Sequence, residues 1–555
     1  MRRLAWVMML VPATALAQHE GHAAGARPGA RPPTLGTVSF PNSGAAAAQE
    51  PFLRGLALLH SFEYEDAAAA FQAARRADPA FAVPVWAEAL THSHVLWGEE
   101  DAAAARAALV ALGATPAERL AHARTPRERA FGAAVEALYA EGAQPARVRG
   151  FADATRQWAT EMPGDHEAAV FAALGELWQS YLTRDDSAAA ALAGEAARRA
   201  ETVYAANPRH PGAAHYMIHA YDSPAGAARG LAAARAYARI APGAEHALHM
   251  PSHIFLPLGM WDEMADSNER AWVASRGWAG RGGRPAWEAD WHDANWLQYA
   301  YLQQGRWRAA RALVDTARVL AAEARRNPAD DRGDAAFALE QLAFRYGSET
   351  GRWDAFPPDS IAVSWRDPAL SARTRTFALN SVFQRAAAAL LARGDTVPAA
   401  NAVRALRDAA RAGDANPLVE RAAGVLEAMV MDARGGRAAG IAALEARRAA
   451  SAVPRNRSMQ PPARLVVEEI LAGRLLAAGR ARDAAAGYAH TLESYPNRAA
   501  ALLGLARART AAGDAAGARE AYARLAAVWR HADADLPALA EVRRGSAART
   551  ASRRR

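Results

Sequence analysis

The sequence of 555 residues contains no cysteine and no lysine, and all 66 of its basic residues are arginine. Without cysteine the chain forms no disulfide, holds no zinc through thiolates, and carries neither a cysteine nucleophile nor a lipid-bearing cysteine. Without lysine it lacks the lysine of a phosphate-binding Walker loop, a Schiff-base lysine and a Ser-x-x-Lys pair. These absences exclude several common enzyme classes and leave the apolar core as the source of stability.

Long apolar runs are also scarce. Residues 1–17, MRRLAWVMMLVPATALA, carry two arginines before an apolar run that is too short to span a bilayer and ends in small residues. This pattern is typical of a secretory signal peptide cleaved near Ala17, and it predicts a secreted or periplasmic protein. No later stretch of about 18 apolar residues follows, so we expect no transmembrane span. Residues 18–48 are rich in Gly, Pro and Ala and predict a flexible leader.

The net charge of +8 comes from the two ends of the chain. Two arginines lie in the predicted signal peptide, and six more follow Val542 in a basic tail that we place at residues 538–555. The body between these ends is close to neutral, which argues against a nucleic-acid partner.

Helical periodicity, interrupted by short Gly, Pro or Asp breaks, runs through the chain from about Gln49. The pattern repeats with a period of 34, because LLAAGRARDAAAGYAHTLESYP matches ARTAAGDAAGAREAYARLA with Gly479 and Gly513 in the same place. Near the N-terminus, GLALLHSFEYEDAAAAFQAARRADP has its Gly, Tyr, Ala, Phe and Pro residues in the order of one such repeat. These segments resemble the tetratricopeptide repeat (TPR) family.

The TPR resemblance implies an all-α fold, a helical solenoid of antiparallel helix pairs in one or two segments. We expect a first solenoid at residues 49–325, an irregular connector at 326–370 and a second solenoid at 371–537. In this family the first helix of each repeat lines a concave groove, and long concave surfaces of this kind suit the binding of peptides or proteins.

Histidine is concentrated in the middle of the chain, with five of the 16 histidines in the 39 residues from His215 to His253. The repeat frame places these and other polar side chains at groove-facing positions, with a kink or helix restart at Pro251. The block from His210 to Gln304 also resembles a group of exported bacterial TPR proteins with a His-rich middle, a resemblance that implies no established activity. The predicted groove residues are His60, His94, His215, His219, Asp222, His246, His249, His253, His292, Asn295 and Tyr299.

Two histidine pairs have the spacing of ligands on one helix face. His215 with His219, and His249 with His253, are each four residues apart, and neighbouring helices pack about 8–10 Å apart, so the four rings can converge on one ion. Neutral imidazoles suit Zn, Cu or Ni, with Asp222 as a ligand or as a partner that orients one. The alternative is a polar groove whose histidines bond to neighbouring helices or to a ligand and hold no metal.

Tryptophan is the second unusual feature of this region, since seven of the 15 tryptophans lie between residues 261 and 307. Trp278, Trp287 and Trp291 lie in or beside a Gly-rich insertion, where they can form an aromatic lip that stacks on a glycan or peptide. The alternative is a loop that packs onto the end of the solenoid.

The leading interpretation is an exported TPR scaffold that binds a peptide or protein partner in the His-lined groove. The alternative is a metal-binding protein or a metal-dependent hydrolase that uses the same histidines, with Asp222, Glu245 or Asp293 as a base. We find no GxSxG motif and no Gly-rich phosphate loop, and enzymatic activity is the less favoured reading. Stoichiometric metal retention would favour the alternative, and pH-sensitive partner binding without metal would favour the scaffold.

Overall fold

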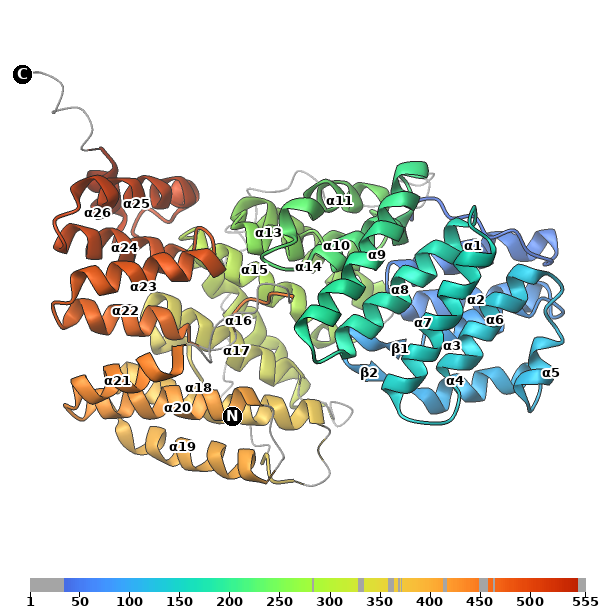
Figure 1. The fold of residues 1–555 in the computed structure, drawn as a ribbon. Helices are drawn as coiled ribbons and strands as arrows, with labels where there is room; N and C mark the ends of the chain where they lie inside the picture. Colours follow the sequence, from blue (N-terminus) through green and yellow to red (C-terminus); the bar gives the residue numbers. More distant parts are fainter. Residues whose placement is uncertain are drawn as a thin grey trace, which may run out of the picture.

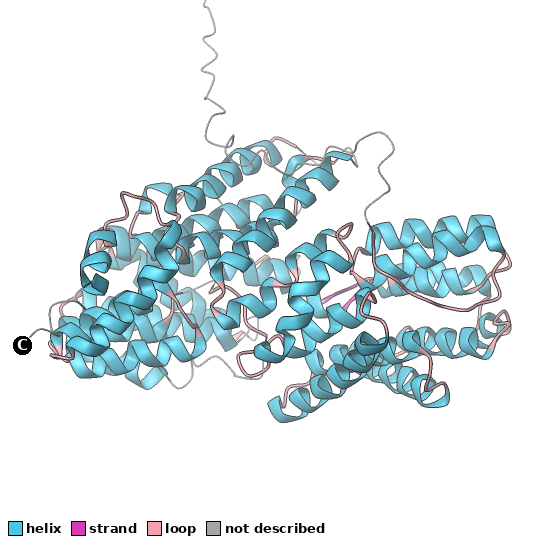
Figure 2. Cartoon of the chain, turned by 90° about the horizontal axis from the view of Figure 1, so that it is seen from above, coloured by secondary structure: helices cyan, strands magenta, loops and turns pink. Residues whose placement is uncertain are grey.

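The structure is a computed structural model, and it describes residues 34–281, 284–327, 334–357, 364–367, 370, 372–412, 417–448, 458–462 and 465–547. The predicted signal peptide and the end of the basic tail lie outside these described residues. Within them the predicted all-α, TPR-like fold is confirmed, because helices account for almost every element and the two strands are two residues long (Figure 2). No described helix is both long and apolar enough to cross a membrane.

In the first half of the chain, the described residues form sixteen α-helices and the short strands β1 (Ser93–His94) and β2 (Glu99–Glu100), which pair antiparallel. The helices are α1 (Ala46–His60), α2 (Tyr64–Ala77), α3 (Val83–Leu90), α4 (Ala102–Leu109), α5 (Pro116–Leu120), α6 (Pro126–Leu138), α7 (Gln144–Glu161), α8 (His166–Leu182), α9 (Asp186–Ala206), α10 (Pro211–Tyr221), α11 (Ala227–Ile240), α12 (Glu245–His249), α13 (Ser252–Leu258), α14 (Trp261–Arg281), α15 (Trp291–Gln303) and α16 (Trp307–Ala324).

The second half continues in the same manner. Its helices are α17 (Asp334–Thr350), α18 (Ala372–Arg393), α19 (Thr396–Arg411), α20 (Pro417–Ala433), α21 (Arg437–Arg448), α22 (Val467–Ala477), α23 (Ala481–Ser494), α24 (Ala499–Ala511), α25 (Ala515–Val528) and α26 (Leu539–Ala547). Figure 1 shows α18–α26 at one end of the molecule, α1–α8 at the other, and α10–α17 between them.

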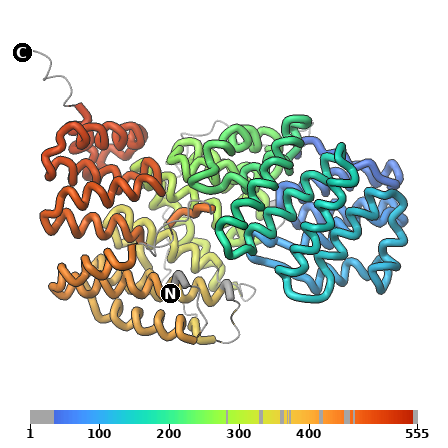
Figure 3. The backbone as a smooth tube through the Cα atoms, in the orientation of Figure 1, coloured from blue at the N-terminus to red at the C-terminus, as the bar shows by residue number. Residues whose placement is uncertain are grey.

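Consecutive helices pack against each other as pairs, and the tube in Figure 3 follows the chain back and forth through them. The turns between helices use glycine where the repeat frame predicts it: Gly259, Gly305, Gly479 and Gly513 all have φ between 64° and 81°. Glycine adopts this left-handed conformation without the penalty that a Cβ imposes. The 34-residue frame therefore locates real turns.

Buried apolar side chains form two cores that meet in the middle of the chain. The first core extends from Phe40 to Ala355, and the second extends from Phe344 to Val542. The partly buried Trp307 and Phe356 pack against both. Met459 lies within the sequence range of the second core. It is nevertheless part of the first core, where it is 2% exposed. The two repeat regions are thus joined by apolar packing.

The structure differs from the predicted boundaries at three places. The last part of the predicted leader, residues 34–48, packs on the solenoid, since Phe40 is buried against Phe52, Phe131 and Trp158. Composition alone could not show this, because the stretch is held by residues far away in the sequence, through the Phe40 ring and through the backbone N–H groups of Thr37 and Ser43, which donate to the Arg209 carbonyl and to Glu128.

The other two differences concern helices. The predicted irregular connector contains α17, whose buried face includes Leu339, Glu340 and Leu342, and the predicted basic tail begins with α26, which buries Leu539 and Val542. In both cases a short apolar face is stabilised by neighbouring helices and gives only a weak signal in the sequence.

Gly259 provides a test of how the two halves are packed. Its φ is +64°, and a Cβ at this position would lie 2.1 Å from the carbonyl oxygen of Pro496 in the second half. Gly435 has a φ of +91° with nothing within 4 Å of such a Cβ, so Gly435→Ala measures the backbone penalty alone, about 1–2 kcal/mol. We expect Gly259→Ala to lower the midpoint of thermal unfolding at least twice as much as Gly435→Ala. Equal shifts would contradict the close packing.

Candidate functional site

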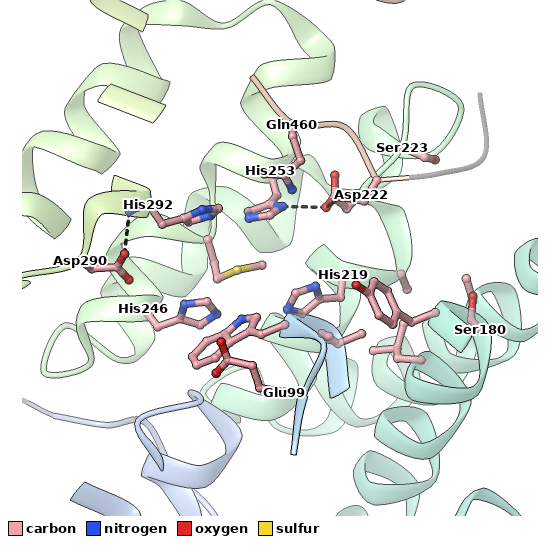
Figure 4. Close-up of a pocket in the computed structure, with 18 of the residues that line it drawn as sticks. Glu99, Ser180, His219, Asp222, Ser223, His246, His253, Asp290, His292 and Gln460 are labelled. Atoms are coloured by element: carbon pink, nitrogen blue, oxygen red, sulfur yellow. Dashed lines mark hydrogen bonds and ion pairs between the residues drawn. The ribbon is translucent and has the colours of Figure 1, made fainter. Parts of the chain in front are cut away.

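Six histidines from four helices gather along one wall of a cavity, and Figure 4 shows four of them. They come from α10, α12, α13 and α15, and their rings pack against one another. The helix is interrupted between α12 and α13 and restarts after Pro251, as expected. The six are His215 and His219 from α10, His246 and His249 from α12, His253 from α13 and His292 from α15.

The cavity has a volume of about 1000 Å³. Its lining includes the edges of His219, His246, His253 and His292. At other parts of its wall lie Trp97, which is 44% exposed, and Tyr181, which is 51% exposed. A small organic molecule fits within this volume and has access to the histidines.

Three histidines, His215, His219 and His246, form the first group, which we call triad 1. One ring nitrogen from each lies within 4.8 Å of the other two. The Nε2 atoms of all three rings are buried and have no hydrogen-bond partner. The Nδ1–H of His215 donates to the carbonyl oxygen of His60 at 2.7 Å, so its Nε2 carries the free lone pair. Three ring nitrogens that lie this close together, with no partner for the Nε2 atoms, form a potential set of metal ligands.

A second group, triad 2, consists of His249, His253 and His292, whose ligand atoms are again within 4.8 Å of one another. The Nδ1–H of His253 donates to Asp222 Oδ2 at 2.6 Å. The Nδ1–H of His249 donates to Asn268 Oδ1 at 2.7 Å, and its Nε2 is buried without a partner. In both rings Nδ1 donates to a side-chain oxygen. Metal-ligating histidines are commonly oriented by a hydrogen bond of this kind.

The Asn268 side chain is itself fixed. Its Nδ2 donates to Ser252 Oγ and to the carbonyl oxygen of Met264, both at 2.7 Å, so its Oδ1 must face His249. Asp222 likewise accepts from Ser458 Oγ at 2.5 Å. Through these contacts, Ser252, Met264 and Ser458 help to fix the rings of His249 and His253.

Burial favours the neutral form of most of these histidines. Burial, with a contribution from His253, lowers the pKa of His219 to about 3. Burial also lowers the pKa values of His215, His246 and His253 well below the usual range. A neutral imidazole is the form that binds a metal ion, so the rings are ready to act as ligands near neutral pH.

The sequence predicted one ion held by His215, His219, His249 and His253, and the structure divides these four residues between two triads. Each i, i+4 pair does share a face, but each pair is completed by a third histidine, His246 or His292. The rings of neighbouring triads remain close, with centroids 6.0 Å apart for His219 and His253 and 6.1 Å apart for His246 and His249. The two triads are therefore adjacent and distinct.

Other predicted groove residues lie away from the cavity wall. His60 is fully buried behind triad 1, where its Nε2–H and that of His210 donate to Glu167 at 2.8 and 3.1 Å. His94 stacks on Tyr64 with ring centroids 3.9 Å apart. These side chains support the wall and contact no ligand space.

Two further groove predictions concern α15. Asn295 Oδ1 bonds to the Arg345 guanidinium, and Tyr299 is fully buried with its hydroxyl 3.0 Å from Arg498. Both positions follow the helix past the end of the histidine wall and face the junction with the second half. They are structural residues, and the predicted open groove does not extend to them.

The predicted aromatic lip is replaced by different rings. Trp291 packs on Trp272 with centroids 5.5 Å apart and donates from Nε1 to the carbonyl oxygen of Trp287. Trp278 lies under the guanidinium of Arg284 at 4.3 Å. The loop thus folds onto the solenoid, which was the alternative interpretation, and the exposed aromatic rings at the cavity are Trp97 and Tyr181.

His246 and His292 were predicted as groove residues but not as metal ligands, and no role was predicted for Asn268. The repeat frame, which placed both histidines on the groove, was the available signal for them. Asn268 gave none, because an asparagine on a surface-type helix pattern has no distinctive neighbours in sequence.

Comparisons with known proteins describe the arrangement of helices alone. No protein family and no curated protein matches the chain. One similar solved structure, "Structure of Naa15/Naa10 bound to HypK-THB", has 13% identity and a TM-score of 0.23 over 90% of this chain and 73% of that one. Another, "Human IFIT1 dimer with m7Gppp-AAAA", has 12% identity and a TM-score of 0.35 over 88% and 96%. Similarities at this level say nothing of function.

Removing the Asn268 amide should weaken the binding of a metal ion without removing a ligand. We expect Asn268→Ala to lower the affinity of triad 2 by about 10–100-fold, since His249 loses the acceptor that orients its ring. Competition with a chromophoric chelator measures the affinity. Asn401→Ala, at an exposed position that pairs with Arg404 far from the site, is the control and should match the wild type.

Proposed function

We propose that this chain is a metal-binding protein that holds two transition-metal ions side by side, one in triad 1 and one in triad 2. The observation that carries the proposal is the set of buried Nε2 atoms without partners in His215, His219, His246 and His249. About nine in ten buried polar groups in proteins have a hydrogen-bond partner, so four unpaired nitrogens on one wall require an explanation.

Two other buried histidines provide an internal comparison. His60 and His210 are also fully buried, and every ring nitrogen in them is bonded: His60 to Glu167 and Tyr216, His210 to Glu167 and the Ala213 amide. A structural role therefore produces bonded histidines in this protein. The unbonded ring nitrogens of the triads differ from these, and a metal ion bound in each triad accounts for them.

The ligand set favours borderline metals. Each triad offers three neutral imidazoles and no thiolate, which suits Zn, Cu or Ni at nitrogen distances of about 2.0–2.1 Å for zinc. Three protein ligands also leave a coordination position open, and the cavity adjoins both triads.

The experiment that tests the proposal is elemental analysis of the full chain, purified without a His tag or a metal column. After equilibration with Zn, Cu or Ni and removal of excess metal, we expect about two equivalents to be retained. A variant with His122→Ala and His490→Ala, two exposed histidines outside the triads, should retain the same amount. No retention of any of the three metals would overturn the proposal.

The cavity favours metal-dependent hydrolysis as the activity that accompanies this binding. A bound ion of this class acts as a Lewis acid and activates water, and the volume of about 1000 Å³ gives a substrate room beside it. Asp222, between Ser458 and His253, is the carboxylate placed to accept a proton. Metal-dependent turnover of activated ester or phosphoester substrates by wild type, and its loss on removal of the metal, would support this activity.

The peptide- or protein-binding role predicted from the sequence stays a prediction. A repeat solenoid with an extended surface supports it. The histidine wall is a poor place for such a partner, because His215 and His249 are buried. A partner that binds with the same affinity before and after metal removal would place this role elsewhere on the solenoid.

A further inference from the structure

Four carboxylates from three segments meet beside the histidine wall. Glu63 follows α1, Glu245 is the first residue of α12, and Asp290 and Asp293 lie at the start of α15. Ligand oxygens of Glu245, Asp290 and Asp293 lie within 4.8 Å of one another. Among the residues whose side chains the structure describes, no arginine forms an ion pair with any of the four; the nearby Arg284 pairs with Glu65 and Glu288 instead.

Two of these carboxylates accept a hydrogen bond from a backbone N–H at the start of a helix. Glu63 Oε1 accepts from the backbone N–H of His246 at 3.0 Å, and Asp290 Oδ1 accepts from that of His292 at 2.7 Å, a contact drawn in Figure 4. Such contacts satisfy one oxygen each. They do not neutralise a cluster of this size.

Asp293 provides the independent observation. It has no exposed surface, and neither of its oxygens accepts a hydrogen bond from an N–H or O–H donor; its side-chain partner in the cluster is the Glu245 carboxyl, another acid. The nearest basic atom is Nδ1 of His249, 3.1 Å from Oδ1, but the hydrogen on that nitrogen is directed to Asn268. A buried carboxylate without a partner is strongly unfavourable, so this group requires a proton or a cation.

The electrostatics of the cluster agree with this need. Burial raises the pKa of Glu63 to about 7, and burial together with the Asp290 carboxylate raises the pKa of Asp293 well above its usual range. Burial and Asp293 have the same effect on Glu245.

We propose that Glu245, Asp290 and Asp293 form a third cation site, specific for a hard divalent ion of the Ca²⁺ class and separate from the two histidine triads. Ca²⁺ binds carboxylate oxygens at about 2.3–2.6 Å, so oxygens up to about twice that distance apart can share one ion. Carboxylates select hard ions, and imidazoles select Zn, Cu or Ni. Asp290 also lines the cavity, which gives the ion a path to the site.

The test is titration calorimetry of the full chain with CaCl2 and, separately, MgCl2, after chelator treatment and removal of the chelator. We expect saturable binding of about one equivalent of at least one of the two ions. Asp290→Asn/Asp293→Asn, which keeps the shape of both side chains, should weaken it at least tenfold. Glu65→Gln, at an exposed carboxylate, is the matched control and should bind as wild type.

Thermal unfolding keeps the proposal testable even if a variant binds nothing because it is poorly folded. With added ion the wild type should gain thermal stability over its state in chelator, and Asp293→Asn should not. His219→Ala/His253→Ala should keep the Ca²⁺ or Mg²⁺ response, so a failure of the histidine sites is distinguishable from a failure here. The proposal is overturned if neither ion binds wild type, or if the double Asn variant binds as wild type does.

Discussion

Replacing His219 and His246 by alanine is expected to remove one of two bound metal equivalents and to leave the other in place. The two residues belong to triad 1, and the loss of two of its three ligands leaves a single imidazole that cannot retain a transition metal against a chelator. His253→Ala/His292→Ala should do the same to triad 2. Elemental analysis of the two double variants, alone and combined, measures the effect.

The same experiment distinguishes two separately bound ions from the single ion, held by four histidines, that the sequence predicted. A shared ion would give at most one equivalent in the wild type, and either double variant would weaken its binding by removing one of its four ligands, His219 or His253. Two independent sites give about one equivalent in each double variant and none in the combination. Circular dichroism and the unfolding midpoint confirm that each variant is folded; full retention in all of them would refute both arrangements.

Arg498→Met is expected to destabilise the protein by about 3–5 kcal/mol, because it leaves two buried carboxylates without their cation. The Arg498 guanidinium donates to Glu469 at 2.6 and 2.9 Å, to Glu349 at 2.7 Å and to the Tyr299 hydroxyl at 3.0 Å. These partners lie on α22, α17 and α15, so one side chain joins the histidine-bearing region to the second half of the chain. Chemical and thermal unfolding measure the loss.

An exposed arginine gives the control for this prediction. Arg480 pairs with Asp483 and Glu445 in the same half, and its side chain is 48% exposed. Exposed pairs of this kind add little to stability, so Arg480→Met should leave the unfolding midpoint unchanged. If the Arg498 and Arg480 variants unfold alike, the buried network does not stabilise the junction between the halves.

The sequence predicted the part of the site that depends on helical periodicity. Residues four apart on a helix share a face, so the pairs His215/His219 and His249/His253 were visible without a structure. The repeat frame also placed His246 and His292 at the same wall, and it located the turn at Gly259 and the break at Pro251. Local rules of spacing were enough for these features.

The division into two triads depends on information that spacing does not carry. His246 and His249 lie on the same five-residue helix, yet they belong to different triads, because the direction of each ring is set by packing against α10 and α15. The partners that fix the rings, Asn268 and Asp222, are 19 and 31 residues from the histidines that they hold. Only a three-dimensional arrangement relates them.

Met459 and Ser458 show that the cavity is completed late in the synthesis of the chain. Ser458 bonds to Asp222 across 236 positions of sequence, and Met459 inserts into the first core, while Gln460 lines the cavity. All six triad histidines leave the ribosome well before this segment does. The first half alone would thus present a cavity with an incomplete wall, and a chimaera that exchanged the second solenoid for another would lose part of the chamber together with the exchanged repeats.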